Sequence, residues 1–437
     1  MKTALQRTCL WWLVLITFFP MPSAYCQQKE DTGQAKKELT LSLEFRPRTE
    51  YRNGYRQMRT DTSSAAFFTE GRSRLNLSFN MKRFIFYTSV QDVRIWGEKD
   101  PRSTVGSIQV FEAYAEPVLA KGLSARIGRQ RVMYDNQRLF AQNDWRQSAG
   151  SHDGLRLMYK SGKLESELFG AFNQEGGEHF FETDFSPDFS NYKLLGVHYL
   201  RYQTSDLFTF TTINATDGFQ DTKDFRKTHF RFTSGGRVER TGKSLYLTLS
   251  AYYQYGHTPD GLALRAFYFQ PEVRYRFPKL LTLRLGAEVF SGDDATTPSE
   301  VSHSFDALYG VNHRFLGSMD YFTRFPKDLN NAGLVAPYLF AIWNIHEKWT
   351  FRTDQHLFFS ENHFLAGGEL IDPFLGFEQD ILLTYTPNSY TEVQLGYSYM
   401  LPTQSMEYIK KGGNSTLWQD WAFLMITFKP ELFKWEK

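Results

Sequence analysis

Hydrophobic and polar residues alternate along the segment LSLEFRPRTEYR, residues 41–52. One set of alternate positions is mostly apolar, as at Leu41, Leu43 and Phe45, and the other set is mostly charged, from Glu44 to Arg52. Successive side chains of a β-strand point to opposite faces. The segment therefore predicts a strand with one apolar face and one face that carries charges of both signs.

The same alternation recurs along the rest of the chain. In residues 265–277, Phe267, Phe269 and Val273 share one face, and Glu272 and Arg274 share the other. Further examples are residues 72–81, 281–289 and 375–385. The strand-like segments run to about ten residues or more, the length that a tilted strand needs to cross a bilayer.

The connections between these segments alternate in length. Short turn-like links occur at 80–83, 119–122, 161–163, 204–206, 241–243, 278–279, 346–348 and 387–389. The longest of the other connections are 53–67, 135–151, 176–190, 292–331 and 402–416. Short turns on one rim and long loops on the other are typical of an outer-membrane barrel. Eight short links and nine other connections predict about 18 strands.

The predicted fold is therefore all-β: a transmembrane antiparallel up-and-down β-barrel with short periplasmic turns and long extracellular loops. Hydrocarbon cannot hydrogen-bond a bare sheet edge, so the sheet must close, with its apolar face toward lipid and its charged face toward the lumen. A secreted β-sandwich would show the same alternation, but its strands are usually only about five to six residues long. Aromatic residues near the predicted strand ends, such as Tyr51, Trp96 and Trp349, also favour the barrel.

The N-terminus has the features of a secretory signal peptide. Lys2 and Arg7 precede an apolar run that is followed by prolines and small residues, which predicts a signal peptide over residues 1–26. A lipoprotein interpretation of Cys26 is disfavoured because bulky Tyr25 stands where that processing requires a small residue. Beyond residue 26 no apolar run is long enough for a transmembrane helix.

The remaining residues, 27–437, are expected to form one outer-membrane barrel. Within them we predict a periplasmic N-terminal segment (27–38), a long loop that is either extracellular or folded into the lumen (292–331), and a C-terminal tail (429–437). Both cysteines of the chain lie in residues 1–26, so the mature chain has no disulfide.

Composition narrows the range of partners. The chain has 50 Lys and Arg against 48 Asp and Glu, and both basic residues of the signal peptide are lost on cleavage. A neutral mature chain does not predict a nucleic-acid partner. Aromatic residues make up 17% of the chain although mean hydropathy is only −0.45, which fits an apolar outer wall around a polar interior.

The alternation assigns many charged residues to the lumen. The predicted pore-lining residues are Arg46, Arg48, Arg72, Arg74, Arg126, Arg156, Arg231, Arg274, Arg276, Arg284, Arg352, Glu50, Glu288 and Asp380. One interpretation is structural, with Arg and acidic residues neutralising each other along the wall. The other is functional, with surplus guanidinium groups that bind carboxylates and select anions.

The 292–331 region contains FDALYGVNHRFLGSMDYF, which is unusually apolar for a surface loop. It is expected either to form a cap with its own small core or to fold inward and narrow the channel. In the second case Tyr309, His313, Tyr321 and Phe322 are candidates to contact a saccharide.

Several segments resemble one known family. RPRTEYRNGY (46–55), GRQRVMYDNQRLF (128–140), FDALYGVNHRFLGSMDYF (305–322), SMEYIKKGG (405–413) and WAFLMITFKP (421–430) are similar, in order, to the alginate export family of outer-membrane porins, and most similar to its shorter Bacteroidetes-type members. The resemblance implies an 18-stranded barrel with an arginine-rich constriction that passes an anionic polymer.

The leading functional hypothesis is a passive, non-enzymatic channel for anionic saccharides of the alginate or oligouronate type. The alternatives are a general porin for small charged solutes and a plugged barrel with an adhesive or structural role. Expected partners are outer-membrane lipid, an anionic oligo- or polysaccharide and, as a further candidate, periplasmic export or uptake machinery. We expect no cofactor, no metal and no catalytic residues, because no histidine or acidic spacing in the chain is diagnostic.

Overall fold

The computed structural model describes residues 37–437 except 101, 103–105, 175–191, 222 and 279. The predicted signal peptide and most of the predicted periplasmic segment 27–38 lie outside the described residues. Within the described residues, no helix has both the length and the apolar character needed to cross a membrane.

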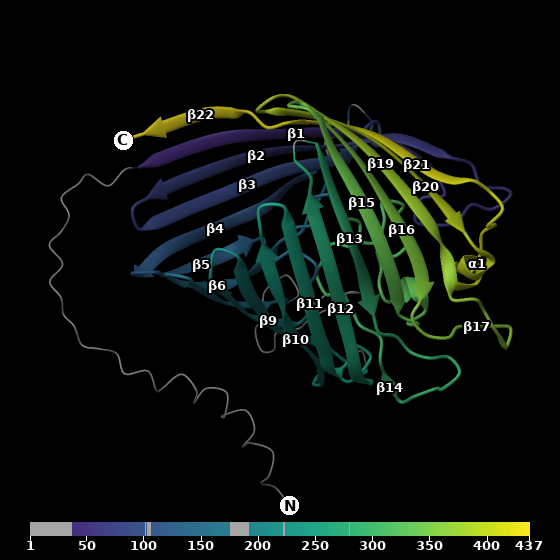
Figure 1. Cartoon of the computed structure of the whole chain (residues 1–437). Helices are drawn as coiled ribbons and strands as arrows, with labels where there is room; N and C mark the ends of the chain where they lie inside the picture. The colour runs from purple at the N-terminus through teal and green to yellow at the C-terminus, as the bar shows by residue number, and fades with distance from the viewer. Residues whose placement is uncertain (1–36, 101, 103–105, 175–191, 222, 279) are drawn as a thin grey trace, which may run out of the picture. The chain divides into compact units, whose positions relative to one another are not determined.

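In the described part of the chain, 18 antiparallel strands close into a barrel, as the alternation predicts (Figure 1). The first nine are β1 (Glu38–Asn53), β2 (Ala66–Met81), β3 (Phe84–Ile95), β4 (Ile108–Ala120), β5 (Leu123–Gln130), β6 (His152–Ser161), β7 (Leu164–Phe172), β8 (Leu194–Gln203) and β9 (Phe208–Gln220). The next eight are β10 (Thr228–Thr241), β11 (Leu245–His257), β12 (Ala263–Arg276), β13 (Leu281–Phe290), β15 (Leu334–His346), β16 (Trp349–Ser360), β19 (Phe374–Asn388) and β20 (Thr391–Pro402). The last is formed by β21 (Gln419–Phe428) and its continuation β22 (Glu431–Glu436).

Shorter elements lie in the long loops. They are β14 (Val301–Ser302), the 3-10 turn η2 (Lys327–Leu329), the hairpin β17 (Leu365–Ala366) and β18 (Glu369–Leu370), and α1 (Gln404–Lys410). Short turns join β2 to β3, β4 to β5, β6 to β7, β8 to β9, β10 to β11, β12 to β13, β15 to β16 and β19 to β20. All eight fall where the sequence predicts them. Both ends of the barrel chain are consequently on the side of the short turns.

The barrel closes where β1 pairs with β21 and β22. Thr49 is opposite Leu424 in the pairing with β21, and Leu41 is opposite Phe433 in the pairing with β22, nearer the short turns. Between the two parts, Pro430 has no N–H to donate to β1, but its carbonyl still accepts the N–H of Leu43 at 3.1 Å. This corrects the prediction that residues 429–437 form a tail, since most of them extend the closing strand.

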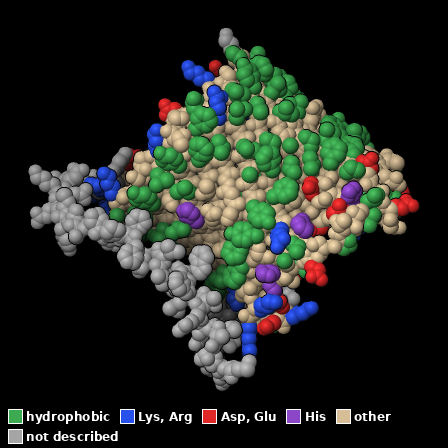
Figure 2. Space-filling view, turned by 60° about the horizontal axis from the view of Figure 1, so that its bottom comes forward, with side chains coloured by type: hydrophobic (Ala, Val, Ile, Leu, Met, Phe, Trp, Pro, Cys, Tyr) green, Lys and Arg blue, Asp and Glu red, His purple; other side chains and the backbone are tan. Residues whose placement is uncertain are grey.

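The two faces of the wall differ as expected. On β12, Phe267 and Val273 are each 46% exposed on the outer face, whereas Tyr268 on the inner face is 1% exposed. Figure 2 shows hydrophobic side chains spread widely over one outer face of the barrel, with charged side chains gathered near its edges. The outward apolar surface is the one that lipid covers.

Two loops fold into the lumen and pack against the inner wall. The 291–333 loop places Phe322 against Phe358 of β16, with ring centroids 4.7 Å apart, and Phe305 against Tyr268 of β12 at 5.5 Å. The 131–151 loop enters as well and adds Phe140 to the same buried hydrophobic cluster. Of the alternatives left open by the sequence, the 291–333 loop therefore adopts the lumen-folding one.

Candidate functional site

The four arginines of β1 and β2, Arg46, Arg48, Arg72 and Arg74, form what we call the arginine wall. Arg46 and Arg72 are directly opposite each other in the β1–β2 register, and both side chains reach Asp144 of the loop inside the barrel. All four residues are buried, at 0 to 5% exposure. Four like charges in so small an area require nearby carboxylates, because an unpaired buried charge is strongly destabilising.

Asp144 of the 131–151 loop supplies one of these carboxylates. It forms ion pairs with Arg72 at 3.0 Å, Arg46 at 3.3 Å and Arg74 at 3.8 Å. Glu44 pairs with Arg72 from the neighbouring position on β1. The loop thus delivers a charge that the arginines of the wall need.

The arginine wall also donates hydrogen bonds to the backbone of the 131–151 loop. Arg48 donates to the carbonyl of Trp145 at 2.9 Å, and Arg72 donates to the carbonyl of Gln147 at 3.2 Å. The guanidinium of Arg48 also lies 4.0 Å from the centroid of the Trp145 ring. These contacts hold the loop against the wall at its backbone and its side chains.

Further around the barrel, on β16 and β19, Asp354, Glu378 and Asp380 form what we call the acidic wall, together with His356; β20 and β21 separate it from the arginine wall. In the β16–β19 register Asp354 is opposite Asp380, and His356 is opposite Glu378. Arg352 pairs with Asp354 through two nitrogen atoms, and its Nε donates at 2.8 Å. Within the described residues, Glu378 and Asp380 have no arginine or lysine partner.

The tip of the 291–333 loop binds the acidic wall through its backbone. The N–H of Met319 donates to Glu378 at 2.6 Å, and the N–H of Ser318 donates to Asp380 at 3.3 Å. Gly317, with φ +81°, precedes them, and a Cβ on this residue would lie 2.5 Å from the Glu378 carboxylate. Glycine is therefore required for the loop to approach so closely.

The two inward loops meet between the walls. The rings of Trp145 and His313 stack with centroids 4.2 Å apart and an interplanar angle of 8°. His313 in turn contacts Asp320 at 2.7 Å, and Tyr55 of the first extracellular loop donates to the same carboxylate. This junction joins three extracellular loops inside the barrel.

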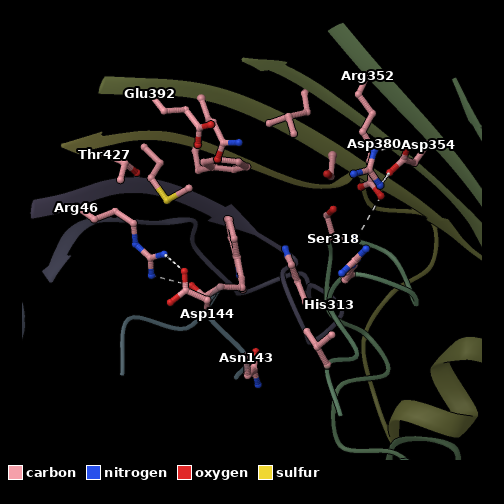
Figure 3. A pocket seen from close by; sticks show the side chains of 18 of the residues that line it. Arg46, Asn143, Asp144, His313, Ser318, Arg352, Asp354, Asp380, Glu392 and Thr427 are labelled. Atoms are coloured by element: carbon pink, nitrogen blue, oxygen red, sulfur yellow. Dashed lines mark hydrogen bonds and ion pairs between the residues drawn. The ribbon is translucent and has the colours of Figure 1, made fainter. Parts of the chain in front are cut away.

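A cavity of about 400 Å³ lies between the walls. Figure 3 shows Arg46 and Asp144 on one side of it, Arg352, Asp354 and Asp380 on the other, and His313 and Ser318 beside them. A second cavity of about 390 Å³ is lined by side chains that include Asp135, Arg237 and Tyr246. Arg314 of the 291–333 loop lines both cavities.

The remaining sequence-predicted arginines are mostly paired with acids. Carboxylate partners in the described structure are found for Arg126, Arg156, Arg231, Arg284 and Arg352. Arg274 instead lies 3.9 Å from the centroid of Tyr246, and Arg276 is exposed at the end of β12. The pairs favour the structural interpretation for most of these arginines.

The predicted acidic and loop residues are also mostly engaged with other protein groups. Glu50 pairs with Arg48 and Arg52, and Glu288 pairs with the loop residue Arg138 at 2.7 Å. Tyr309 donates to Asp217 at 3.0 Å.

The expectation that Tyr321 and Phe322 contact a saccharide is corrected by their position. Both are completely buried: Phe322 packs against Phe358 of β16, and Tyr321 donates to the carbonyl of Gly54, so neither is exposed to a solute. His313, by contrast, does line the cavity between the walls.

Sequence reasoning missed the residues that complete the site. Asp144, Trp145 and Arg314 lie on loops, where no period of two reveals the direction of a side chain. His356 follows the inward phase of Asp354 on β16 and was accessible to the same parity argument that identified Asp380.

Comparison with known proteins agrees with this geometry. The family described as alginate export matches residues 37–402. No curated protein matches the chain significantly. Among solved structures, Pseudomonas aeruginosa OpdO superposes with a TM-score of 0.61 at 13% identity, over 90% of this chain and 98% of that chain.

Two other crystal structures are similar to a comparable degree. Pseudomonas aeruginosa OpdL gives a TM-score of 0.61 at 12% identity, over 90% of this chain and 99% of that chain. A BenF-like porin from Pseudomonas fluorescens Pf-5 gives 0.60 at 10% identity, with the same coverage. At such identities the similarity establishes the fold alone.

Proposed function

The chain belongs to the alginate export family and is a porin-like channel of the bacterial outer membrane, and on this premise we propose that its solute is an anionic saccharide of the alginate or oligouronate type. The solute crosses by passive diffusion, and the protein carries out no chemical step on it. The observation that supports this proposal best is the position of Arg314.

Arg314 places an uncompensated positive charge in the lumen. Its side chain is exposed to both cavities, and among the described residues it has no ion-pair partner. The pKa of Arg314 lies below its ordinary value because the surrounding protein displaces water and because the positive charges of Arg284 and Arg352 act on it. An anionic solute relieves that repulsion, and a planar guanidinium binds a carboxylate through two parallel hydrogen bonds.

The other lumen arginines support Arg314 indirectly. Arg46 and Arg352 line the same cavity, but Asp144 and Asp354 neutralise them. They keep the two loops and walls in place, so Arg314 is presented at a defined position between the cavities. Most lumen arginines are thus neutralised, and Arg314 is not. A chain of almost neutral net charge can therefore still favour anions, since local charges set selectivity.

The test is the ion selectivity of Arg314→Glu in planar bilayers. Wild-type protein in a KCl gradient is expected to show an anion-directed reversal potential and current block by oligogalacturonate. Arg314→Glu should lower the anion-to-cation permeability ratio severalfold and abolish the block.

Arg324→Gln is the matched control. Arg324 is on the same loop, but its side chain is 75% exposed and pairs with Asp328. Its removal should leave selectivity unchanged. A reversal potential that is equal in wild type and Arg314→Glu would refute the proposal.

One observation favours a general porin as a second candidate. Glu392 lines the same cavity as Arg314, and in the described part of the chain it has no cationic partner, so the lumen also offers a free negative charge. Liposome swelling separates the two functions. Equal rates for a neutral trisaccharide and a trigalacturonate would support the general porin, and absence of swelling with either would indicate a plugged barrel.

A further inference from the structure

Three side chains of the acidic wall are arranged as ligands of one cation. Asp354 and His356 are two residues apart on β16 and therefore share the inner face, and Asp380 is opposite Asp354 on β19. One donor atom from each residue lies within 4.8 Å of the other two. Donor atoms that bind one tetrahedral metal ion at about 2 Å are separated by about 3.3 Å, so the three side chains would have to move closer together to bind it.

The imidazole of His356 is buried without a hydrogen bond. The residue is 2% exposed, and its Nδ1 has no partner in the described structure. Its Nε2 points at Asp380 Oδ2 from 3.7 Å, which is too long for a hydrogen bond. Phe340 and Phe358 pack against the ring at centroid distances of 5.2 and 5.8 Å, but neither offers a hydrogen bond. A buried imidazole normally satisfies at least one ring nitrogen, and a metal ligated by the ring would do so.

The carboxylates of this wall also lack compensating charge. Arg352 neutralises Asp354. Glu378 accepts the N–H of Met319, and Asp380 accepts the N–H of Ser318 and also faces the side chains of Ser398 and Glu378 within hydrogen-bonding reach, but none of these groups carries a positive charge. One oxygen of each, Glu378 Oε2 and Asp380 Oδ1, is buried without a hydrogen-bond partner among the described residues. Two buried negative charges without a cation are strongly unfavourable, and one divalent cation would compensate both.

We propose that Asp354, His356 and Asp380 bind a divalent cation of the zinc class. One imidazole nitrogen and two carboxylate oxygens are a ligand set that Zn²⁺ accepts, with a fourth position open to the cavity. Glu378 lies beside Asp380 and contributes its charge without being a ligand. The three ligand residues line the cavity between the walls, which provides a path for the ion to enter.

The bound cation would fix the tip of the 291–333 loop. Asp380 accepts the N–H of Ser318, so a metal that orients this carboxylate also orients the loop that carries Arg314. The inference concerns the metal alone and does not depend on which solute the channel passes.

Zinc titration of the refolded, EDTA-treated full-length barrel tests the proposal. Isothermal titration with ZnCl₂ should give one saturable site per chain. His356→Gln and Asp380→Asn should each weaken it at least about tenfold. His363→Gln is the control, because His363 is an exposed histidine that also contacts an aspartate, Asp294, and it should bind zinc like wild type.

A second measurement covers variants that do not fold. Co²⁺ added to wild-type protein should give the visible absorption of a nitrogen- and oxygen-ligated ion, and added Zn²⁺ should remove it. Absence of saturable zinc binding to wild type, or equal affinity of wild type and folded His356→Gln, would overturn the site. In that case the excess charge must be compensated by protons.

Discussion

The arginine wall and the acidic wall each hold one inward loop, but by opposite chemistry. Guanidinium groups of the arginine wall donate to backbone carbonyls of the 131–151 loop. Carboxylates of the acidic wall accept from backbone N–H groups of the 291–333 loop. A strand wall of either sign can therefore dock a loop, because every peptide unit offers both a donor and an acceptor.

The two walls differ in their balance of charge. Each of the four arginines of the first wall pairs with at least one of Glu44, Glu50, Glu70 and the loop residue Asp144. In the second wall only Asp354 has an arginine partner within the described residues. Every charged residue of the first wall thus has a partner of opposite charge, whereas Glu378 and Asp380 of the second wall require a proton or a cation.

The strongest test of this difference is removal of a central arginine. Arg72→Met leaves Glu44 and Asp144 without their main partner, and removing one member of a buried pair costs about 3–5 kcal/mol. We expect a loss of this order in the free energy of unfolding, measured by urea titration in lipid vesicles, and rapid proteolysis in the 131–151 loop. Arg94→Met is the control, because Arg94 is 54% exposed and pairs with Asp92 instead of with a residue of the loop. Equal losses in both variants would show that the arginine wall does not hold the loop.

Paired amide substitutions compare the walls directly. Glu44→Gln removes the charge that faces Arg72 and should cost about 1.5–3 kcal/mol. Glu378→Gln keeps an acceptor for the Met319 N–H and relieves excess negative charge, so it should leave stability unchanged or increase it. Both variants are measured by urea titration in EDTA, which removes any bound metal. Equal costs would contradict the assignment of surplus charge to the acidic wall.

Acidification should release the loop of the arginine wall. Burial alone would raise the pKa of Asp144, but the positive charges of Arg72 and Arg46 outweigh it and hold the pKa below its ordinary value of 3.8. A carboxylate whose pKa is lowered in the folded state stabilises that state fully above the ordinary pKa, and this contribution is lost as the pH falls from the ordinary pKa through the lowered one. Protease sensitivity of the 131–151 loop should therefore rise below about pH 4. In Asp144→Asn the loop should already be sensitive at neutral pH, and a steep acid response in that variant would assign the effect to another group.

The junction between the loops should give the smallest effect. Trp145→Leu removes the stacking on His313 and the contact with Arg48, which together are worth about 1 kcal/mol. A double-mutant cycle with His313→Leu isolates the coupling of the two loops. Additive effects of the two substitutions would mean that each loop docks independently of the other.

The barrel wall could be predicted because its pattern is local. Alternation on β1 and β12 assigned Arg46, Arg48 and Glu272 to the inner face, and turn chemistry located all eight short links. Pro430 shows the limit of such reasoning. It suggests a break in a strand, but only the pairing of Glu431 with Ser42 shows that the strand resumes after it.

The interior could not be predicted in the same way. His356 and Asp380 lie far apart in the chain, in a spacing that matches no metal motif, and the register of β16 and β19 alone brings them together. No metal was therefore predicted from the sequence. Likewise, nothing local distinguishes Asp144 and Arg314 from ordinary charged loop residues.

The sequence by itself determined the closed sheet, its apolar outer surface, its charged inner surface and the side on which the long loops lie. The reason is that a lipid environment imposes a strict period of two on every strand. The tertiary structure alone decided which loops enter the lumen and which charges they cancel, because these depend on contacts between residues distant in the chain. It thereby left Arg314 as a free cation among the described residues, and Glu378 and Asp380 as surplus acids.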